Sequence, residues 1–149
     1  MERLREVMLF FAQKAFIIND GKLLLIKKDA GESAKCANKY ELPGGRMDYG
    51  ETVDEALKRE VFEEVGIEII PGRPLDTFEF YFERDGKRHQ VVALVRFCEP
   101  INLSVTSENQ VTSDHIAGIE WVPLPKVKDL DLISDVKPII LRAVEELLG

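Results

Sequence analysis

The arrangement of apolar and polar residues predicts that most of the chain forms strands. Residues 10–18 and 22–28 are dominated by aliphatic and aromatic side chains, and Asn19-Asp20-Gly21 between them is typical of a hairpin turn. Residues 75–84 and 88–98 are predicted to form a second hairpin. Shorter strands are expected at residues 40–42, 67–70 and 119–122, and Pro43-Gly44-Gly45 is expected to form a turn. The polar stretches 29–39 and 102–114 are expected to be loops.

Two segments have the composition of helices. Residues 52–65 contain neither glycine nor proline, and a helical spacing of about 100° per residue gathers their apolar residues into one stripe. This stripe consists of Val53, Ala56, Leu57, Val61 and Val65. Residues 135–148 form a second amphipathic segment, with Asp135 as a candidate N-cap. A mixed sheet with one internal and one terminal helix predicts an α/β layered domain, and we expect a single domain covering residues 1–149.

The first predicted helix carries acidic residues on its apolar side. With the helical spacing, Glu60 and Glu64 fall inside the apolar stripe and Glu63 lies at its edge. Carboxylates drawn partly into a core are costly unless a cation neutralises them. Like charges spaced three and four residues apart also disfavour the bare helix. A group of hard oxygen ligands on one helix therefore indicates a site for Mg²⁺ or Mn²⁺.

The same glutamates could instead form an ordinary solvated face, with Arg59 as an ion-pair partner. A plain amphipathic helix keeps its carboxylates on the side away from the core. Glu60 and Glu64 are predicted on the opposite side, among apolar residues. This position favours the metal site over the solvated face.

The composition limits the classes of partner. The net charge of −7 argues against DNA or long RNA as the main partner, because binding a phosphate backbone requires a basic face. A small nucleotide that arrives with its own metal ion is compatible with this charge. Cys36 and Cys98 form neither a zinc-binding spacing nor a disulfide framework. The apolar run at residues 7–12 is too short for a signal sequence or a membrane span, so we expect a cytoplasmic protein with no membrane partner.

Residues 45–67, GRMDYGETVDEALKREVFEEVGI, fit one fixed pattern. The pattern is glycine, five residues, glutamate, seven residues and then Arg-Glu-apolar-x-Glu-Glu-x-Gly-apolar. With each residue type used at several per cent, a chance match at every fixed position is on the order of one in a hundred million. The pattern resembles the signature box of the Nudix hydrolases, a family that cleaves nucleoside diphosphates linked to another group. The resemblance implies a Nudix-type α/β/α sandwich, with a mixed sheet between helices.

The resemblance also implies roles for residues in and beside the box. Metal binding is implied for the carbonyl oxygen of Gly44 and for the side chains of Glu60, Glu63 and Glu64. Arg59 would orient a glutamate, jointly with Glu51, so that Glu63, Arg59 and Glu51 form the catalytic group. An arginine present only for solubility is the alternative.

The general base stays open, because members of the family take it either from the box or from a distant loop. The loop before Trp121 offers Glu108 and Asp114 as a base or an additional metal ligand. Asp114-His115 lies where relatives often carry Glu-His, although a capping role for Asp114 would look the same. Arg46 and Lys39 flank the expected cleft and are candidates for contacting substrate phosphates, with a solvated side chain as the alternative.

The expected reaction is Mg²⁺-dependent hydrolysis of a phosphoanhydride bond in a nucleoside diphosphate derivative. A nucleoside or deoxynucleoside triphosphate pyrophosphohydrolase is favoured, because the chain lacks the proline that ADP-ribose hydrolases usually carry at a set distance after the box. ADP-ribose or a dinucleotide is the alternative substrate. An alternative of another class is a non-catalytic, nucleotide-sensing module of Nudix fold, but such modules usually have broken boxes. The sequence leaves a monomer and a homodimer both open.

Overall fold

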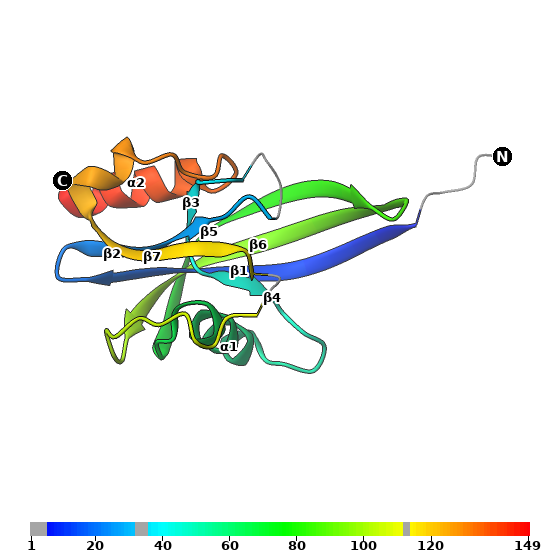
Figure 1. Ribbon diagram of the computed structural model, residues 1–149, viewed down its shortest axis with the longest axis horizontal. Coiled ribbons are helices and arrows are strands. Elements are labelled where there is room, and N and C mark those ends of the chain that lie inside the picture. The colour runs from blue at the N-terminus through cyan, green and yellow to red at the C-terminus, as the bar shows by residue number, and fades with distance from the viewer. Residues whose placement is uncertain (1–5, 32–35, 112–113) are drawn as a thin grey trace.

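The computed structural model describes residues 6–31, 36–111 and 114–149. A mixed sheet lies between two helices, α1 (Val53–Val65) and α2 (Lys137–Leu148), which cover its opposite faces (Figure 1). This arrangement confirms the predicted α/β class and the layered order. Parts of the predicted loops 29–39 and 102–114 lie outside the described residues.

The longest strands form one half of the sheet. β5 (Ile69–Arg84) pairs antiparallel with β6 (Lys87–Pro100), which pairs parallel with β1 (Val7–Asn19). The short strand β4 (Gly44–Arg46) pairs antiparallel with the middle of β1. In Figure 1 the N-terminal end of β1 and the hairpin that joins β5 to β6 extend beyond both helices as a long arm.

The other half of the sheet is antiparallel. β2 (Lys22–Lys28) lies between β3 (Tyr40–Glu41) and β7 (Ile116–Pro123). It is joined to β1 through the predicted turn, in which Asp20 and Gly21 have φ angles of 51° and 71°. A 3₁₀ helix (Leu124–Asp129) follows β7. Among the helices in the described residues, none is long and apolar enough to cross a membrane.

Local signals at both ends explain why α1 forms where it does. Thr52 is the N-cap: its side chain accepts from the amide of Glu55, whose carboxylate accepts from the amide of Thr52. Gly66 ends the helix with a φ of 76°, a left-handed conformation that glycine adopts readily. Val53, which was predicted in the buried stripe, is 47% exposed, so this part of the prediction is wrong. It occupies the first helical position, at the edge of the packed face.

Three other details differ from the predictions. β5 is continuous where separate strands were expected at residues 67–70 and 75–84, because irregular pairing around Pro71 and Pro74 lets the strand continue. Gly44 and Gly45, expected in a turn, belong to β4. The N-cap of α2 is Val136 rather than Asp135, and this cap has no side-chain hydrogen bond.

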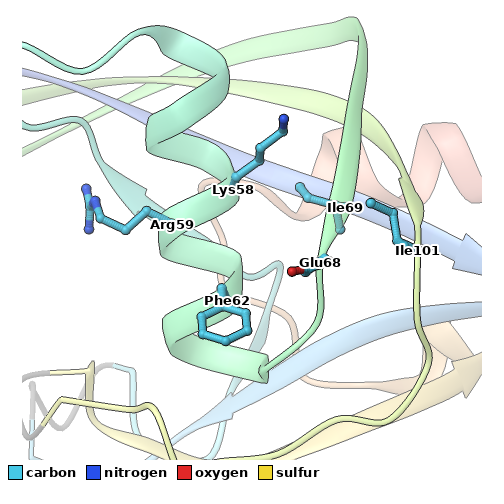
Figure 2. Close-up of a pocket in the computed structure, with 6 residues that line it drawn as sticks. All are labelled: Lys58, Arg59, Phe62, Glu68, Ile69 and Ile101. Carbon is cyan, nitrogen blue, oxygen red and sulfur yellow. The ribbon is translucent and has the colours of Figure 1, made fainter.

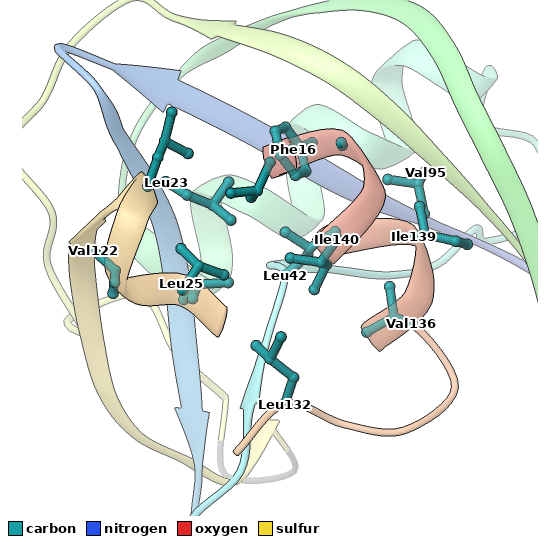
Figure 3. Close-up of a cluster of buried hydrophobic side chains, with 14 residues drawn as sticks. Phe16, Leu23, Leu25, Leu42, Val95, Val122, Leu132, Val136, Ile139 and Ile140 are labelled. Carbon is teal, nitrogen blue, oxygen red and sulfur yellow. The ribbon is translucent and has the colours of Figure 1, made fainter. Parts of the chain in front are cut away.

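Alternating residues of the strands supply buried hydrophobic clusters on both faces of the sheet. The core beneath α2 includes Phe16, Leu25 and Ile140 (Figure 3). The core beneath α1 includes Ile17, Leu24 and Leu57. The glycine-containing strand β4 lies along α1, so the fold brings residues 44–46 next to the glutamates of the helix.

Candidate active site

Glu64 is the most deeply buried of the acidic residues on α1. It is 4% exposed, and its Oε1 accepts a hydrogen bond of 2.7 Å from the backbone N–H of Gly44. Burial raises the pKa of Glu64 to about 8, and the positive charge of Lys14 and the Gly44 N–H oppose this only in part. A carboxyl group in this position gains strongly from a nearby cation.

Glu60 and Glu63 lie beside Glu64 with increasing exposure. The side chain of Glu60 is 15% exposed and that of Glu63 is 30% exposed. Burial raises the pKa of Glu60, although Arg59 opposes the shift. Glu60 packs directly against Gly45, where a Cβ atom would stand only 2.5 Å from its Oε2. The glycine therefore makes the space that Glu60 occupies.

The backbone of β4 approaches β1 closely at Gly44. Its φ of 143° lies outside the range that other residues adopt readily, and a Cβ atom there would stand 2.1 Å from the carbonyl oxygen of Gln13. Glycine at this position brings the N–H of Gly44 to Glu64. The metal-binding role expected for the carbonyl oxygen of Gly44 stays a prediction.

Arg59 connects the carboxylates to one another. Its Nε and Nη2 donate to the two carboxylate oxygens of Glu51 at 2.6 and 2.9 Å, a bidentate pair. This hydrogen bonding lowers the pKa of Glu51 to about 2. Nη1 of Arg59 donates to Glu60 at 3.1 Å and to Glu63 at 3.3 Å, and Nη2 also donates to the carbonyl oxygen of Arg46. The structure thus brings Glu51, Arg59, Glu60 and Glu63 together.

The two acidic candidates from the distant loop are placed differently. Asp114 is close enough to Glu60 and Glu64 for its negative charge to raise the pKa of both. Its Oδ2 accepts from the backbone N–H of Val111 at 3.0 Å, so it also closes a local turn. Glu108 is exposed, and its described hydrogen bond joins its own N–H to Thr106. Of these two residues, Asp114 is the one whose charge acts on Glu60 and Glu64.

The two candidate phosphate contacts also differ. The guanidinium of Arg46 lies over the ring of Phe10, 4.2 Å from its centre, while its backbone carbonyl meets Arg59. Lys39 is partly exposed in the turn before β3, where its carbonyl oxygen accepts from the amide of Lys28. The backbone of Arg46 therefore meets Arg59, while its guanidinium is directed to Phe10.

Two further residues at the site were not singled out from the sequence. Nζ of Lys14 pairs with Glu41 at 3.0 Å, and its charge lowers the pKa of Glu64. Nε2 of Gln110 donates to the backbone carbonyl of Glu64 at 2.9 Å. Both contacts join segments that are far apart in the chain, so no local pattern in the sequence predicts them.

A cavity of about 480 Å³ opens on another side of α1 and is lined by Lys58, Arg59, Phe62, Glu68, Ile69 and Ile101. Figure 2 shows the guanidinium of Arg59 directed away from Lys58 and Ile69. Arg59 is the single predicted site residue in this lining. The candidate site therefore lies at the carboxylates and not in this cavity.

The donor chemistry at the carboxylates suits a hard divalent cation. Glu60, Glu63 and Glu64 offer oxygen ligands, of which the buried Glu64 most needs a compensating charge. In the part of the chain that the structure describes, no group of three His, Cys, Asp or Glu side chains is already placed to hold a metal ion. Instead Arg59 donates to Glu60 and Glu63. The residues fit Mg²⁺ or Mn²⁺ by their chemistry, and their side chains would have to rearrange to hold the ion.

Comparison with known proteins places the chain in a defined group. A family model described as the NUDIX domain matches residues 9–143. The nucleoside triphosphatase NudI of Enterobacter sp. (strain 638) is 32% identical over 123 residues, which cover 78% of this chain and 83% of that protein. The 8-oxo-dGTP diphosphatase of Haemophilus influenzae is 37% identical over 62 residues, which cover 42% of this chain and 44% of that protein.

The fold agrees with a solved structure over the whole length. The MutT protein from Methanosarcina mazei Go1 superposes with a TM-score of 0.74 and 26% sequence identity. The match covers 99% of this chain and 100% of that one. The shared architecture includes the sheet between helices on which the carboxylates are arranged.

Proposed function

This chain belongs to the Nudix hydrolase family, and we propose that it hydrolyses a nucleoside or deoxynucleoside triphosphate to a monophosphate and pyrophosphate with Mg²⁺ or Mn²⁺. The observation that carries the proposal is the position of Glu60 and Glu64, which contact Gly45 and Gly44 of β4. Glu63 lies beside them on the same helix. Nudix hydrolases generally use a divalent metal. Glu60, Glu63 and Glu64 would hold it here, with the carbonyl oxygen of Gly44 as a further ligand.

When bound, the cation supplies positive charge to phosphate oxygens and lowers the pKa of a coordinated water. The carboxylates of this chain hold that charge in place. In the reaction, a water oxygen forms a bond to one phosphorus of the anhydride, and the bond from that phosphorus to the bridging oxygen breaks. The bridging oxygen leaves with the departing phosphate group. A carboxylate accepts the proton of the water, and Glu63 and Asp114 are the candidates for this step.

Arg59 would act as a positioning residue for these carboxylates. Its bidentate pair with Glu51 fixes the guanidinium, which then contacts Glu60 and Glu63. A guanidinium held at two points restricts the side-chain rotations of the acids that it contacts. We therefore assign Glu51 and Arg59 the task of orienting Glu60 and Glu63.

An aromatic surface next to the site supports a substrate that carries a base. We call Phe10, Phe78, Phe80, Phe82 and His89 the aromatic face. Its rings stack in a continuous row, with centres 4.7 to 6.3 Å apart, along β1, β5 and β6. Arg46 joins this row to the carboxylates, since its guanidinium lies over Phe10 and its carbonyl meets Arg59. Aromatic rings stack on any nucleobase, and each such contact contributes about 1–3 kcal/mol.

The preference for a triphosphate rests on the relatives. NudI is a nucleoside triphosphatase by name and the Haemophilus influenzae relative is an 8-oxo-dGTP diphosphatase. ADP-ribose or a dinucleotide is the second substrate class, and a nucleotide sensor without turnover is the alternative from another class.

The proposal is tested by incubating the protein with Mg²⁺ and a panel of nucleoside triphosphates, ADP-ribose and dinucleotides, and measuring released pyrophosphate and phosphate. We expect pyrophosphate from a triphosphate. Glu64→Gln should lower kcat by about 10²–10³-fold, the scale seen when one group that stabilises developing charge is removed. Glu145→Gln, an exposed glutamate on α2, is the matched control. Nucleotide binding without turnover of any substrate would support the sensor instead.

A further inference from the structure

We propose that Lys28 and Gln110 are positioning residues, which hold the chain on either side of residues 112–113 beside α1 and so keep Asp114 near Glu60 and Glu64. The importance of this placement for catalysis rests on the proposed function. The proposal concerns the residues on either side of 112–113, which lie outside the described part of the chain.

Lys28 attaches Asp114 to the sheet. It is the last residue of β2 and is 7% exposed, and its Nζ donates to the backbone carbonyl of Asp114 at 2.7 Å. The next residues continue the attachment, because the amide of Asp29 donates to the carbonyl of His115 at 2.8 Å. Burying an ammonium group costs several kcal/mol, which an apolar side chain of similar length would avoid. A lysine here therefore indicates a task beyond packing.

Gln110 attaches the chain before residues 112–113 to the C-terminal turn of α1. The last four carbonyl groups of a helix have no partner within it. Nε2 of Gln110 donates to the carbonyl oxygen of Glu64 at 2.9 Å, and the amide of Thr106 donates to that of Val65, also at 2.9 Å. Glu64, whose side chain lies in the acidic site, thus also binds Gln110 through its backbone carbonyl.

The two attachments leave Asp114 in a restricted place. Gln110 contacts the C-terminal turn of α1, and Asp114 contacts Lys28 at the end of β2. The carboxylate of Asp114 closes a turn by accepting from the amide of Val111 at 3.0 Å. Its negative charge adds to the raised pKa of Glu60 and of Glu64, for both of which burial is the main cause. Loss of either attachment should release this carboxylate from the acidic face without altering the helix.

A double-mutant cycle on a triphosphate substrate tests the proposal. Lys28→Met keeps the length of the side chain and removes the donor, and replacing a buried charge by an apolar group is compatible with folding. We expect Lys28→Met to lower kcat by about tenfold with KM changed by less than about twofold. In an Asp114→Asn background the same change should alter kcat by less than about twofold, because the group that Lys28 positions is already lost.

Lys22→Met is the matched control, since it removes a lysine from the exposed start of the same strand. It should leave kcat unchanged. Gln110→Met should reproduce the effect of Lys28→Met and its dependence on Asp114. An equal loss of kcat from Lys28→Met in both backgrounds, a change confined to KM, or an Asp114→Asn variant of normal activity would overturn the proposal.

A readout without turnover separates this inference from the proposed function. If the wild type hydrolyses nothing, the proposed function fails, and amide hydrogen exchange decides the placement instead. We expect Lys28→Met to speed exchange in residues 108–111 and 114–116 while α1 and β6 stay protected, and Lys22→Met to change neither. Unchanged exchange in residues 108–111 and 114–116 would overturn the inference, whatever the activity assay gives.

Discussion

The carboxyl group of Glu64 is central to the chemistry of this site. It is nearly enclosed, receives one hydrogen bond from Gly44, and has Asp114 and Glu60 as acidic neighbours. Burial and the acidic neighbours disfavour its charged form more than Lys14 and the Gly44 N–H favour it, so the metal-free protein holds a proton there near neutral pH. A cation at the site replaces that proton, and the burial that opposes ionisation becomes the reason for metal binding.

The metal-free protein should lose stability as the pH rises through this range. The unfolded chain releases the Glu64 proton near the ordinary value of 4.5, whereas the folded protein keeps it up to a pKa of about 8. The folded state therefore binds more protons across this window, and the free energy of unfolding falls as the pH increases. Below pH 4.5 both states are protonated, so the effect disappears.

Urea unfolding in EDTA, from about pH 5 to about pH 8, measures this effect when the wild type is compared with Glu64→Gln. The variant has no proton to release at this position. The difference in unfolding free energy, wild type minus variant, should decrease steadily with pH. Parallel curves for the two proteins would contradict the assignment.

At this scale the sequence predicts the acids but not their supports. Glu60, Glu63, Glu64 and Arg59 were identified because their spacing within one helix is a local pattern. The contacts of Lys28 with Asp114 and of Gln110 with Glu64 join residues 86 and 46 positions apart. Lysine and glutamine are common in loops and strand ends, so neither carries a signal before the chain is folded.

Among the elements, β4 shapes the site through its two glycines, and alanine substitutions should separate their tasks. Gly44→Ala should destabilise the fold by about 1–3 kcal/mol, because its φ of 143° is unfavourable for alanine and the new Cβ meets the backbone of Gln13. In Gly45→Ala, the atoms nearest the new Cβ belong to the carboxylate of Glu60, the far end of a flexible side chain. This variant should keep its stability and lose about tenfold or more in kcat, because misplacing a catalytic group is costly.

Thermal unfolding and steady-state kinetics on both variants check this division. The expected pattern is a lowered Tm for Gly44→Ala and a lowered kcat at normal Tm for Gly45→Ala. A Gly45→Ala protein with normal kcat would show that Glu60 does not need its present position.

The arm formed by β1, β5 and β6 offers a test of base recognition. Phe82 belongs to the aromatic face, and Tyr81, its neighbour in β5, is 67% exposed on the opposite face of the strand. Phe82→Leu should raise KM for a nucleoside triphosphate by about tenfold, as expected from the loss of one stacking contact. Hydrolysis of inorganic tripolyphosphate, which has no base, should be unaffected.

Tyr81→Leu serves as the control for the arm and should leave both substrates unchanged. Equal effects of Phe82→Leu on the nucleotide and on tripolyphosphate would point to a disturbed fold rather than to base contact. The two kinetic profiles together decide whether the aromatic face meets the substrate.

The elements that the sequence predicted well are those with local signals at their ends. Thr52 and Gly66 mark the ends of α1, and the Asp20-Gly21 and Asp85-Gly86 turns have the positive φ angles that such sequences favour. β5 was divided wrongly because Pro71 and Pro74 usually interrupt strands. The pairing with β6, a partner distant in sequence from these prolines, carries β5 past them with shifts in register.

At the scale of the whole molecule, the acidic site lies between α1 and strand β4 of the sheet. Metal binding should therefore be linked to folding. α1, β4 and the segment around Asp114 all contribute, and they contact one another through Glu64. A ligand that binds only the folded state stabilises it, by about 2.7 kcal/mol at a concentration one hundred times its Kd. For a protein of this size, that corresponds to a rise in Tm of about 5–10 °C.

Thermal unfolding in EDTA and in saturating Mg²⁺ measures this linkage. The wild type should gain Tm in Mg²⁺, and Glu64→Gln should gain much less. The control variant Glu145→Gln should behave as the wild type does. An equal gain for Glu64→Gln would mean that the cation binds elsewhere.

The most direct measurement is anomalous diffraction from crystals of the protein soaked in Mn²⁺. We expect a manganese peak bounded by the carboxylates of Glu60 and Glu64, with the guanidinium of Arg59 still paired to Glu51. A peak at another place on the molecule, or none at saturating Mn²⁺, would contradict the account.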